Sequence, residues 1–278
     1  MKSSDNQSPL ITVRALGPFF AISFGLTWGL ALLMILFPEQ LTAIFGEISP
    51  ANPLYIVAVY APGIAGLLLV LRYFGLRGLG SFLKRFTLFR ASLGWWLFLV
   101  LGIPAVYYLG ALIVGSLNEP FPFEPWHSVI PALLFMLVLG PVEEFGWRGV
   151  ALPLLQRRFV PLWSGLLLGA VWGVWHLPSF FIGGTPHAEW DFVAFLVGVI
   201  SLSVIMTALF NSSRGSLILA VLFHFQINNP IWPDGKPWDF LLFSLVAVVI
   251  VILNREKMLT KDTSVTEVLM PGDEKVQN

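Results

Sequence analysis

Three charged residues stand close together inside a long apolar stretch of the sequence. They are Glu143, Glu144 and Arg148, in the segment 141–149. A charge at the centre of a membrane-spanning helix costs about 2.5–3.5 kcal/mol on insertion scales, and such residues usually face a protein interior or a water-filled cavity. Glu144 and Arg148 are four residues apart and share a helix face, so they can pair. Glu143 points about 100° away and has no obvious partner on its own helix. We therefore expect Arg148 to hold Glu144 and Glu143 to be free for chemistry; a purely structural ion network is the alternative.

Two further apolar segments each carry a histidine with a second side chain one helical turn away. Trp172 precedes His176 by four residues, and Asn228 follows His224 by four residues. Residues at this spacing project from the same helix face. A single histidine in a membrane helix is usually a packing residue. Two histidines, an amide and a free carboxylate on three segments instead indicate one polar site.

A carboxylate, two imidazoles and an amide are suited to hydrolysis of a peptide or amide bond. Glu143 can act as the general base that removes a proton from water, and His176 can position that water. His224 and Asn228 can donate hydrogen bonds to the oxyanion of a tetrahedral intermediate. The candidate catalytic residues are Glu143, Glu144, His176, His224 and Asn228, supported by Arg148 and Trp172.

A zinc ion that activates the water is the alternative chemistry, with Glu143, His176 and His224 as its ligands. The sequence has no His-Glu-x-x-His motif, so it does not match the common zinc protease pattern. The metal-free reaction is favoured, and the zinc alternative stays open. The other two histidines, His127 and His187, fall in polar loops and are expected to be ordinary surface residues.

Composition places this site in a membrane protein. Of 278 residues, 56% are hydrophobic and 12% are charged, whereas soluble proteins carry about 25% charged residues. There is no cysteine, which excludes disulfides and thiolate chemistry. The net charge is +0, so no basic surface for a nucleic-acid partner is indicated.

Eight apolar segments are candidates for crossing the bilayer, and all of them should be helices. They lie near residues 16–37, 52–74, 93–116, 128–152, 161–182, 192–211, 214–230 and 238–254. The fold class is therefore all-α and polytopic, with about eight transmembrane helices. The seventh segment is short and polar, so hydropathy supports it least.

The loops between these segments alternate in charge. Basic residues gather on one set of loops and acidic residues on the other, with Lys236 as the exception. The positive-inside rule then places both termini in the cytoplasm. Counted from that face at about 1.5 Å per residue, the candidate site lies in the cytoplasmic half of the membrane or near its middle.

Three parts of the chain are expected. Residues 1–127 hold the first three helices, 128–230 form a catalytic core of four helices, and 231–278 hold the last helix and a polar, mobile cytoplasmic tail. Small residues four apart predict close helix packing in two places. These are the pair Gly25 and Gly29, and the run Gly165, Gly169 and Gly173.

The ordered motifs resemble the CAAX protease and bacteriocin-processing (CPBP, or Abi) family of intramembrane peptidases. Glu-Glu-x-x-x-Arg corresponds to residues 143–148, aromatic-x-x-x-His to 172–176 and His-x-x-x-Asn to 224–228, each on its own segment. This family includes type 2 CAAX prenyl proteases and proteins like lysostaphin resistance protein A. The second motif commonly begins with Phe, where this chain has Trp172, and we expect the change to affect packing more than chemistry.

The resemblance implies a bundle of eight helices around a cavity that opens toward the cytoplasm. It implies Glu143 as the catalytic base with His176 beside it, and His224 with Asn228 as the oxyanion site. It also implies a protein or peptide substrate that enters from the membrane or the cytoplasmic side. Whether that substrate is prenylated does not follow. The short loops favour a bacterial cell membrane as the location.

Two other functions could use the same polar residues. A proton-coupled transporter could use Glu143 and the histidines as a relay, although the internal repeats typical of transporters are not visible. A non-catalytic immunity or scaffold protein could bind a partner through the same cavity. The intramembrane endopeptidase is the favoured function, because catalysis best explains polar groups placed at such cost.

Overall fold

The apolar segments of the sequence are helical, because inside a bilayer the backbone polar groups have no water to bond. The computed structural model describes residues 11–276 and contains no strand in that range. The α-helices are α1 (Leu16–Leu36), α2 (Pro38–Phe45), α3 (Pro53–Lys84), α4 (Leu93–Leu97), α5 (Ile103–Val114), α6 (Val129–Leu139), α7 (Glu144–Gly146), α8 (Leu152–Gln156), α9 (Pro161–Trp175), α10 (Phe192–Ser212), α11 (Leu217–Ile227), α12 (Trp238–Leu253), α13 (Arg255–Met258) and α14 (Asp273–Val276). The prediction of an all-α, polytopic membrane protein is confirmed.

Six helical segments of the described chain are long and apolar enough to cross a membrane. They are Val13–Leu36, Pro53–Thr87, Leu93–Val114, Trp126–Gln156, Pro161–Phe181 and Phe192–Ser212. Helices α11 and α12 are apolar but shorter. Each of the eight expected segments is thus helical, while the number of crossings stays a prediction.

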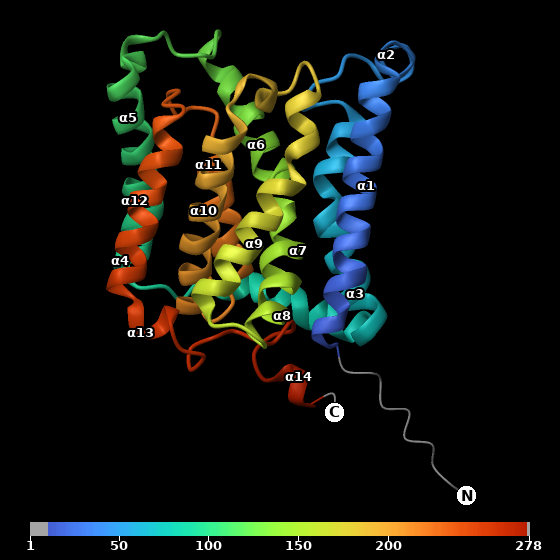
Figure 1. Ribbon diagram of the computed structural model, residues 1–278, viewed down its shortest axis with the longest axis vertical. Helices are drawn as coiled ribbons and strands as arrows, with labels where there is room; N and C mark the ends of the chain where they lie inside the picture. Colours follow the sequence, from blue (N-terminus) through green and yellow to red (C-terminus); the bar gives the residue numbers. More distant parts are fainter. Residues whose placement is uncertain (1–10, 277–278) are drawn as a thin grey trace, which may run out of the picture.

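The helices run up and down between two ends of the bundle (Figure 1). The start of α1 and the helices α13 and α14 lie together at one end, which we call the terminal end. Helix α2 and the start of α6 lie at the opposite end, which we call the far end. Both ends of the described chain on one side agree with an even number of crossings. Their cytoplasmic position stays a prediction.

The segment that carries the three charges is not one regular helix. Helix α6 ends at Leu139, and a 3-10 turn (Pro141–Glu143), α7 and a π-helical turn (Trp147–Ala151) follow before α8. Pro141 has no N–H to continue the α-helical bonding pattern, which gives a local reason for the break. Single π turns inside helices are frequent at functional sites. Both glutamates therefore lie at the junction between α6 and α7.

Glycines let neighbouring helices approach this junction closely. A Cβ atom at Gly146 would lie 2.1 Å from the carbonyl oxygen of Pro62 in α3, so no larger residue fits there. In the run on α9, a Cβ at Gly169 would lie 2.7 Å from Cα of Ile200 in α10. A Cβ added at Gly165 or Gly173 would also lie too close to atoms of α10, so the predicted packing role of this run is confirmed. The prediction is wrong for Gly25 and Gly29, where an added Cβ meets nothing within 4 Å.

The C-terminal tail packs against the terminal end, so the prediction of a mobile tail is wrong for its described part; residues 277–278 lie outside the described residues. Val268 and Leu269 are fully buried. Arg157 donates two hydrogen bonds to the carboxylate of Glu274, at 3.1 and 3.2 Å. The tail is polar overall, so its composition did not indicate that a few apolar residues anchor it to the bundle.

Arg85 ties the tail to the interior of the bundle. It is fully buried and donates to the carbonyl oxygens of Gly149, Gly215 and Val268, at 3.0, 2.9 and 2.7 Å. The sequence indicated only three charged residues away from loops, tails and helix ends. The structure also buries Arg85, where three backbone carbonyls accept hydrogen bonds from Nε and Nη1, while Nη2 has no partner among the described residues.

Candidate active site

A cavity of about 360 Å³ lies in the half of the bundle nearer the far end. Among its lining residues are Glu143, Trp172, His176, His224 and Asn228. These come from the α6–α7 junction, α9 and α11, so the fold brings together the residues that the sequence placed on three segments. The sequence placed the site in the half nearer the termini or near the middle of the membrane, and the lining residues lie near the middle or in the opposite half.

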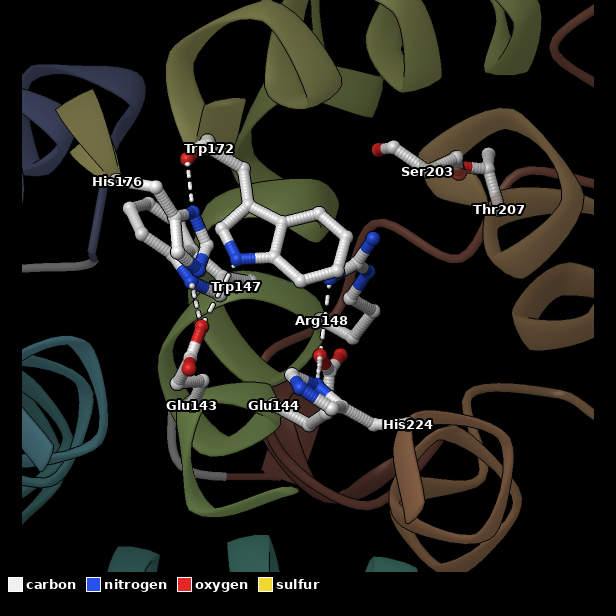
Figure 2. A network of polar contacts seen from close by, with 9 residues as sticks. All are labelled: Glu143, Glu144, Trp147, Arg148, Trp172, His176, Ser203, Thr207 and His224. Atoms are coloured by element: carbon white, nitrogen blue, oxygen red, sulfur yellow. Dashed lines mark hydrogen bonds and ion pairs between the residues drawn. The ribbon is translucent and has the colours of Figure 1, made fainter. Parts of the chain in front are cut away.

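Glu143 is held by two tryptophan side chains (Figure 2). Its Oε2 accepts hydrogen bonds from Nε1 of Trp172, at 2.8 Å, and from Nε1 of Trp147, at 3.2 Å. The prediction that Glu143 has no partner on its own helix is wrong, since Trp147 lies four residues along the same segment. Among the described residues no protein group donates to Oε1 of Glu143. One carboxylate oxygen is thus fixed, and the other is left for a ligand or water.

Trp172 does more than pack. A phenylalanine at this position could not donate the 2.8 Å hydrogen bond to Glu143. The indole ring also lies 4.5 Å from the guanidinium carbon of Arg148, a cation–π distance. The expectation that the change from Phe to Trp affects packing more than chemistry therefore leaves out this hydrogen bond to Glu143, which the sequence did not indicate.

Glu144, Arg148 and His224 form a second polar network, in which Oε2 of Glu144 and Nε and Nη2 of Arg148 are buried without a hydrogen-bond partner among the described residues (Figure 2). Oε1 of Glu144 accepts from Nη1 of Arg148 at 3.0 Å, as the sequence spacing predicts. The same oxygen lies 2.6 Å from Nδ1 of His224. Glu144 and Arg148 are fully buried, so Glu144 does not reach the cavity. It orients His224 and balances charge.

We expect Arg148→Ala to destabilise the protein by about 3–5 kcal/mol, the usual cost of removing one partner of a buried ion pair. The loss leaves the Glu144 carboxylate without its cation in a fully buried place. Thermal unfolding of purified protein in detergent would measure the effect. Arg158→Ala is the control, because Arg158 is exposed, and an equal shift for both variants would contradict the role assigned to Arg148.

The side chains of His224 and Asn228 converge on one spot beside Gly140. A Cβ added to Gly140 would lie 2.9 Å from Nε2 of His224 and 2.3 Å from Nδ2 of Asn228. Gly140 precedes Glu143 by one turn, and its carbonyl accepts the Glu143 backbone N–H at 3.0 Å. Only a glycine leaves this spot open. Sequence reasoning missed Gly140, and a glycine directly before Pro141 in an apolar helix was the available signal.

His176 lies just after α9 and lines the same cavity. Its Nδ1 is 2.8 Å from the carbonyl oxygen of Trp172. Because a carbonyl can only accept, Nδ1 carries the proton and Nε2 of the neutral ring is an acceptor. His176 makes no hydrogen bond with Glu143, so any cooperation between them needs an intervening water or substrate.

His187 belongs to the cavity as well, so its expected surface position is wrong. Its ring centroid lies 5.3 Å from that of His176 and 4.6 Å from that of Trp190. His187 is half-buried, and burial is the main cause that lowers the pKa of its ring well below its ordinary value. The loop that carries it folds back over the bundle, which its polarity did not indicate. His127 is exposed, as expected.

The donors proposed for zinc are not arranged as a metal site. Within residues 11–276 no group of three or more His, Asp or Glu side chains is placed to hold a metal ion. The bonds to Oε2 of Glu143 and to Nδ1 of the two histidines leave Oε1 and both Nε2 atoms open. It is therefore the spacing of Glu143, His176 and His224, and not their bonding, that does not fit a shared zinc ion.

Comparison with known proteins gives two matches. The family model described as type II CAAX prenyl endopeptidase, Rce1-like, matches residues 125–229. The chain is also similar to CAAX prenyl protease 2 of Methanococcus maripaludis, with 30% identity over 178 residues, or 57% of this chain and 65% of that protein. The three motifs all lie inside 125–229. The resemblance to CAAX proteases that the motifs indicate is confirmed.

Proposed function

We propose that this chain is an intramembrane endopeptidase that hydrolyses a peptide bond of a membrane-associated or lipid-modified protein, as in CAAX-type processing. One observation carries the proposal. A carboxylate with a free oxygen, Glu143, lies one turn from a spot on which two side-chain nitrogen atoms, Nε2 of His224 and Nδ2 of Asn228, converge. The similarity to CAAX prenyl proteases supports the same reaction class.

In this mechanism Glu143 is the general base. The two indole N–H groups fix Oε2, and Oε1 takes a proton from a water molecule in the cavity. The water oxygen attacks the carbonyl carbon of the scissile peptide bond, and the carbonyl electrons move onto its oxygen. Glu143 then gives the proton to the departing nitrogen. The C–N bond breaks, and the products are a carboxyl terminus and an amine.

His176 positions the water in this scheme. Its neutral ring presents Nε2 as an acceptor, because Nδ1 donates to the Trp172 carbonyl. A water that donates one proton toward Glu143 can donate the other toward His176. This arrangement aims a lone pair of the water oxygen at the substrate.

His224 and Asn228 stabilise the oxyanion. Nδ2 of Asn228 donates in any state, whereas Nε2 of His224 donates only when the ring carries both protons, since Nδ1 faces Glu144. The carboxylate of Glu144, 2.6 Å away, balances that charge. Hydrogen bonds held ready for a developing negative charge are usually the largest single contribution to catalysis.

We expect Gly140→Ala to reduce kcat/KM by about 10²-fold, the cost of disabling an oxyanion donor. The added methyl group would occupy the spot between His224 and Asn228 and push the amide aside. Steady-state kinetics on a cleaved peptide would measure this. Gly29→Ala, whose methyl meets nothing within 4 Å, should leave activity unchanged. Full activity of Gly140→Ala would contradict the assigned oxyanion site.

The shape of the cavity favours hydrolysis over proton-coupled transport. A transporter needs a path that can continue to the other side of the membrane. Here the side chains next to the cavity floor, Glu144 and Arg148, are fully buried and bonded to each other. The residues that line the cavity come from the far half and the middle of the bundle, so its lining does not continue to the terminal end. An immunity or scaffold protein could also use such a pocket, but it would not need the base.

The test is a comparison of membrane-protein termini in cells that carry the wild-type chain or Glu143→Gln. New protein ends that occur only with the wild type would support the peptidase and identify its substrate. Identical termini, together with an unchanged cellular phenotype, would overturn the proposal in favour of a binding role. A bacterial origin and a metal-free reaction are two further parts of this proposal, and the outcome of this experiment does not depend on them.

A further inference from the structure

The cavity and the chain termini lie at opposite ends of the bundle. The residues of α1 that line the cavity are Thr27, Ala31 and Met34, in the half of the helix away from the terminal end. In α10 they are Phe195, Val199 and Leu202, again in the far half. The mouth is built from residues of three far-end connections, 46–52, 176–191 and 228–237.

The two ends differ sharply in basic residues. The far-end connections are residues 37–52, 115–128, 182–191 and 228–237, and they contain one lysine, Lys236, and no arginine. The lysine is 2.8 Å from the carboxylate of Asp234, which neutralises it. Each connection at the terminal end contains at least one arginine, and these are Arg85, Arg90, Arg157, Arg158 and Arg214.

This difference decides on which side of the membrane the cavity opens. Loops rich in Lys and Arg stay in the cytoplasm, and acidic residues contribute little to orientation. The terminal end is then cytoplasmic, and the cavity mouth faces away from the cytoplasm. The family resemblance implied a cavity open to the cytoplasm, and the loop charges implied cytoplasmic termini. The structure makes these two expectations incompatible.

The mouth and the interior select different features of a ligand. The three connections that build the mouth carry four acidic residues, Glu47, Glu189, Asp191 and Asp234, against one lysine, Lys236, which pairs with Asp234. The mouth is therefore net acidic, and an acidic rim attracts cationic peptides and repels acidic ones. The interior is lined by aromatic rings, among them Tyr55, Tyr107 and Trp175, and these suit apolar side chains.

We propose that the cavity opens on the extracytoplasmic face and takes an apolar peptide segment flanked by basic residues, presented from that side by a membrane-associated protein. What happens to the segment in the cavity rests on the proposed function. The side of entry does not, because it follows from the loop charges and the position of the mouth.

The natural absence of cysteine makes the side of entry directly measurable. Ala51 is exposed at the far end and Thr260 at the terminal end, so Ala51→Cys and Thr260→Cys each add a single thiol. A membrane-impermeant maleimide added to intact cells should label Ala51→Cys at once and Thr260→Cys only after permeabilisation. The reverse pattern, or equal labelling of both in intact cells, would overturn the proposal.

The substrate class needs a second measurement, with two internally quenched peptides that share an apolar core. One is flanked by lysines and the other by glutamates. Right-side-out membrane vesicles with the wild-type chain should cleave the lysine peptide about tenfold faster at low salt, and salt should reduce the difference. Vesicles with Glu143→Gln should cleave neither. Equal rates for the two peptides would overturn the substrate class.

Failure of the proposed side of entry and failure of the proposed peptidase function give different results. Cleavage by inside-out vesicles but not by right-side-out vesicles would overturn the side of entry and leave the peptidase intact. No cleavage of either peptide in either orientation or in detergent would count against the peptidase, while maleimide labelling would still decide which way the cavity opens.

Discussion

Replacing Glu143 by glutamine is expected to lower the rate of peptide cleavage by about 10⁴-fold, the upper range for loss of a general base. The amide has the shape of the carboxylate, and its oxygen can still accept from Trp147 and Trp172. The fold should therefore persist while the group that takes the proton from water is lost. Initial rates of purified wild type and variant, on the peptide found by comparing termini, would measure the effect.

A matched control separates loss of the base from loss of a buried carboxylate. Glu274 is also a buried carboxylate, but it binds Arg157 at the terminal end and does not line the cavity. Glu274→Gln should weaken the docking of the tail and leave the cleavage rate within a few-fold of wild type. If Glu143→Gln retained the wild-type rate, the glutamate mechanism would be wrong.

The second large effect is expected for Asn228→Ala, with a loss of about 10²–10³ in kcat and little change in KM. Nδ2 of Asn228 lies beside Gly140 and donates no hydrogen bond to a protein group in the described chain. An interaction made only with the developing oxyanion lowers kcat rather than substrate affinity. Steady-state kinetics over a range of substrate concentrations would separate the two parameters.

The neighbouring Asn229 provides the control. Its amide donates to the side chain of Gln226 at 3.1 Å, and its carbonyl oxygen accepts from the backbone of Ile231 at 3.2 Å. Asn229→Ala should therefore cost stability at the end of α11 but leave kcat within a few-fold of wild type. Equal losses of kcat in both variants would show that disturbing this turn, rather than removing a donor, lowers the rate.

The sequence by itself predicted five of the residues that line the cavity and the kind of protein that holds them. Charged and polar side chains are costly in lipid, so Glu143, His176 and His224 stood out against an apolar background. Helix spacing alone predicted the Glu144–Arg148 pair, because residues four apart are neighbours on any α-helical turn. The ordered motifs also indicated the family resemblance. All of these features depend on composition or on the spacing of residues within one segment, and both can be read directly from the sequence.

Only the tertiary structure decided how those residues are used. Trp172 reaches Glu143 from 29 positions away, and His224 reaches Glu144 from 80 positions away. The structure also brought His187 into the cavity and placed the mouth at the far end. Such contacts depend on how helices pack, and the packing depends on close approaches such as that of Gly146 to Pro62. Hydropathy and spacing describe one segment at a time, so they could not predict contacts between segments.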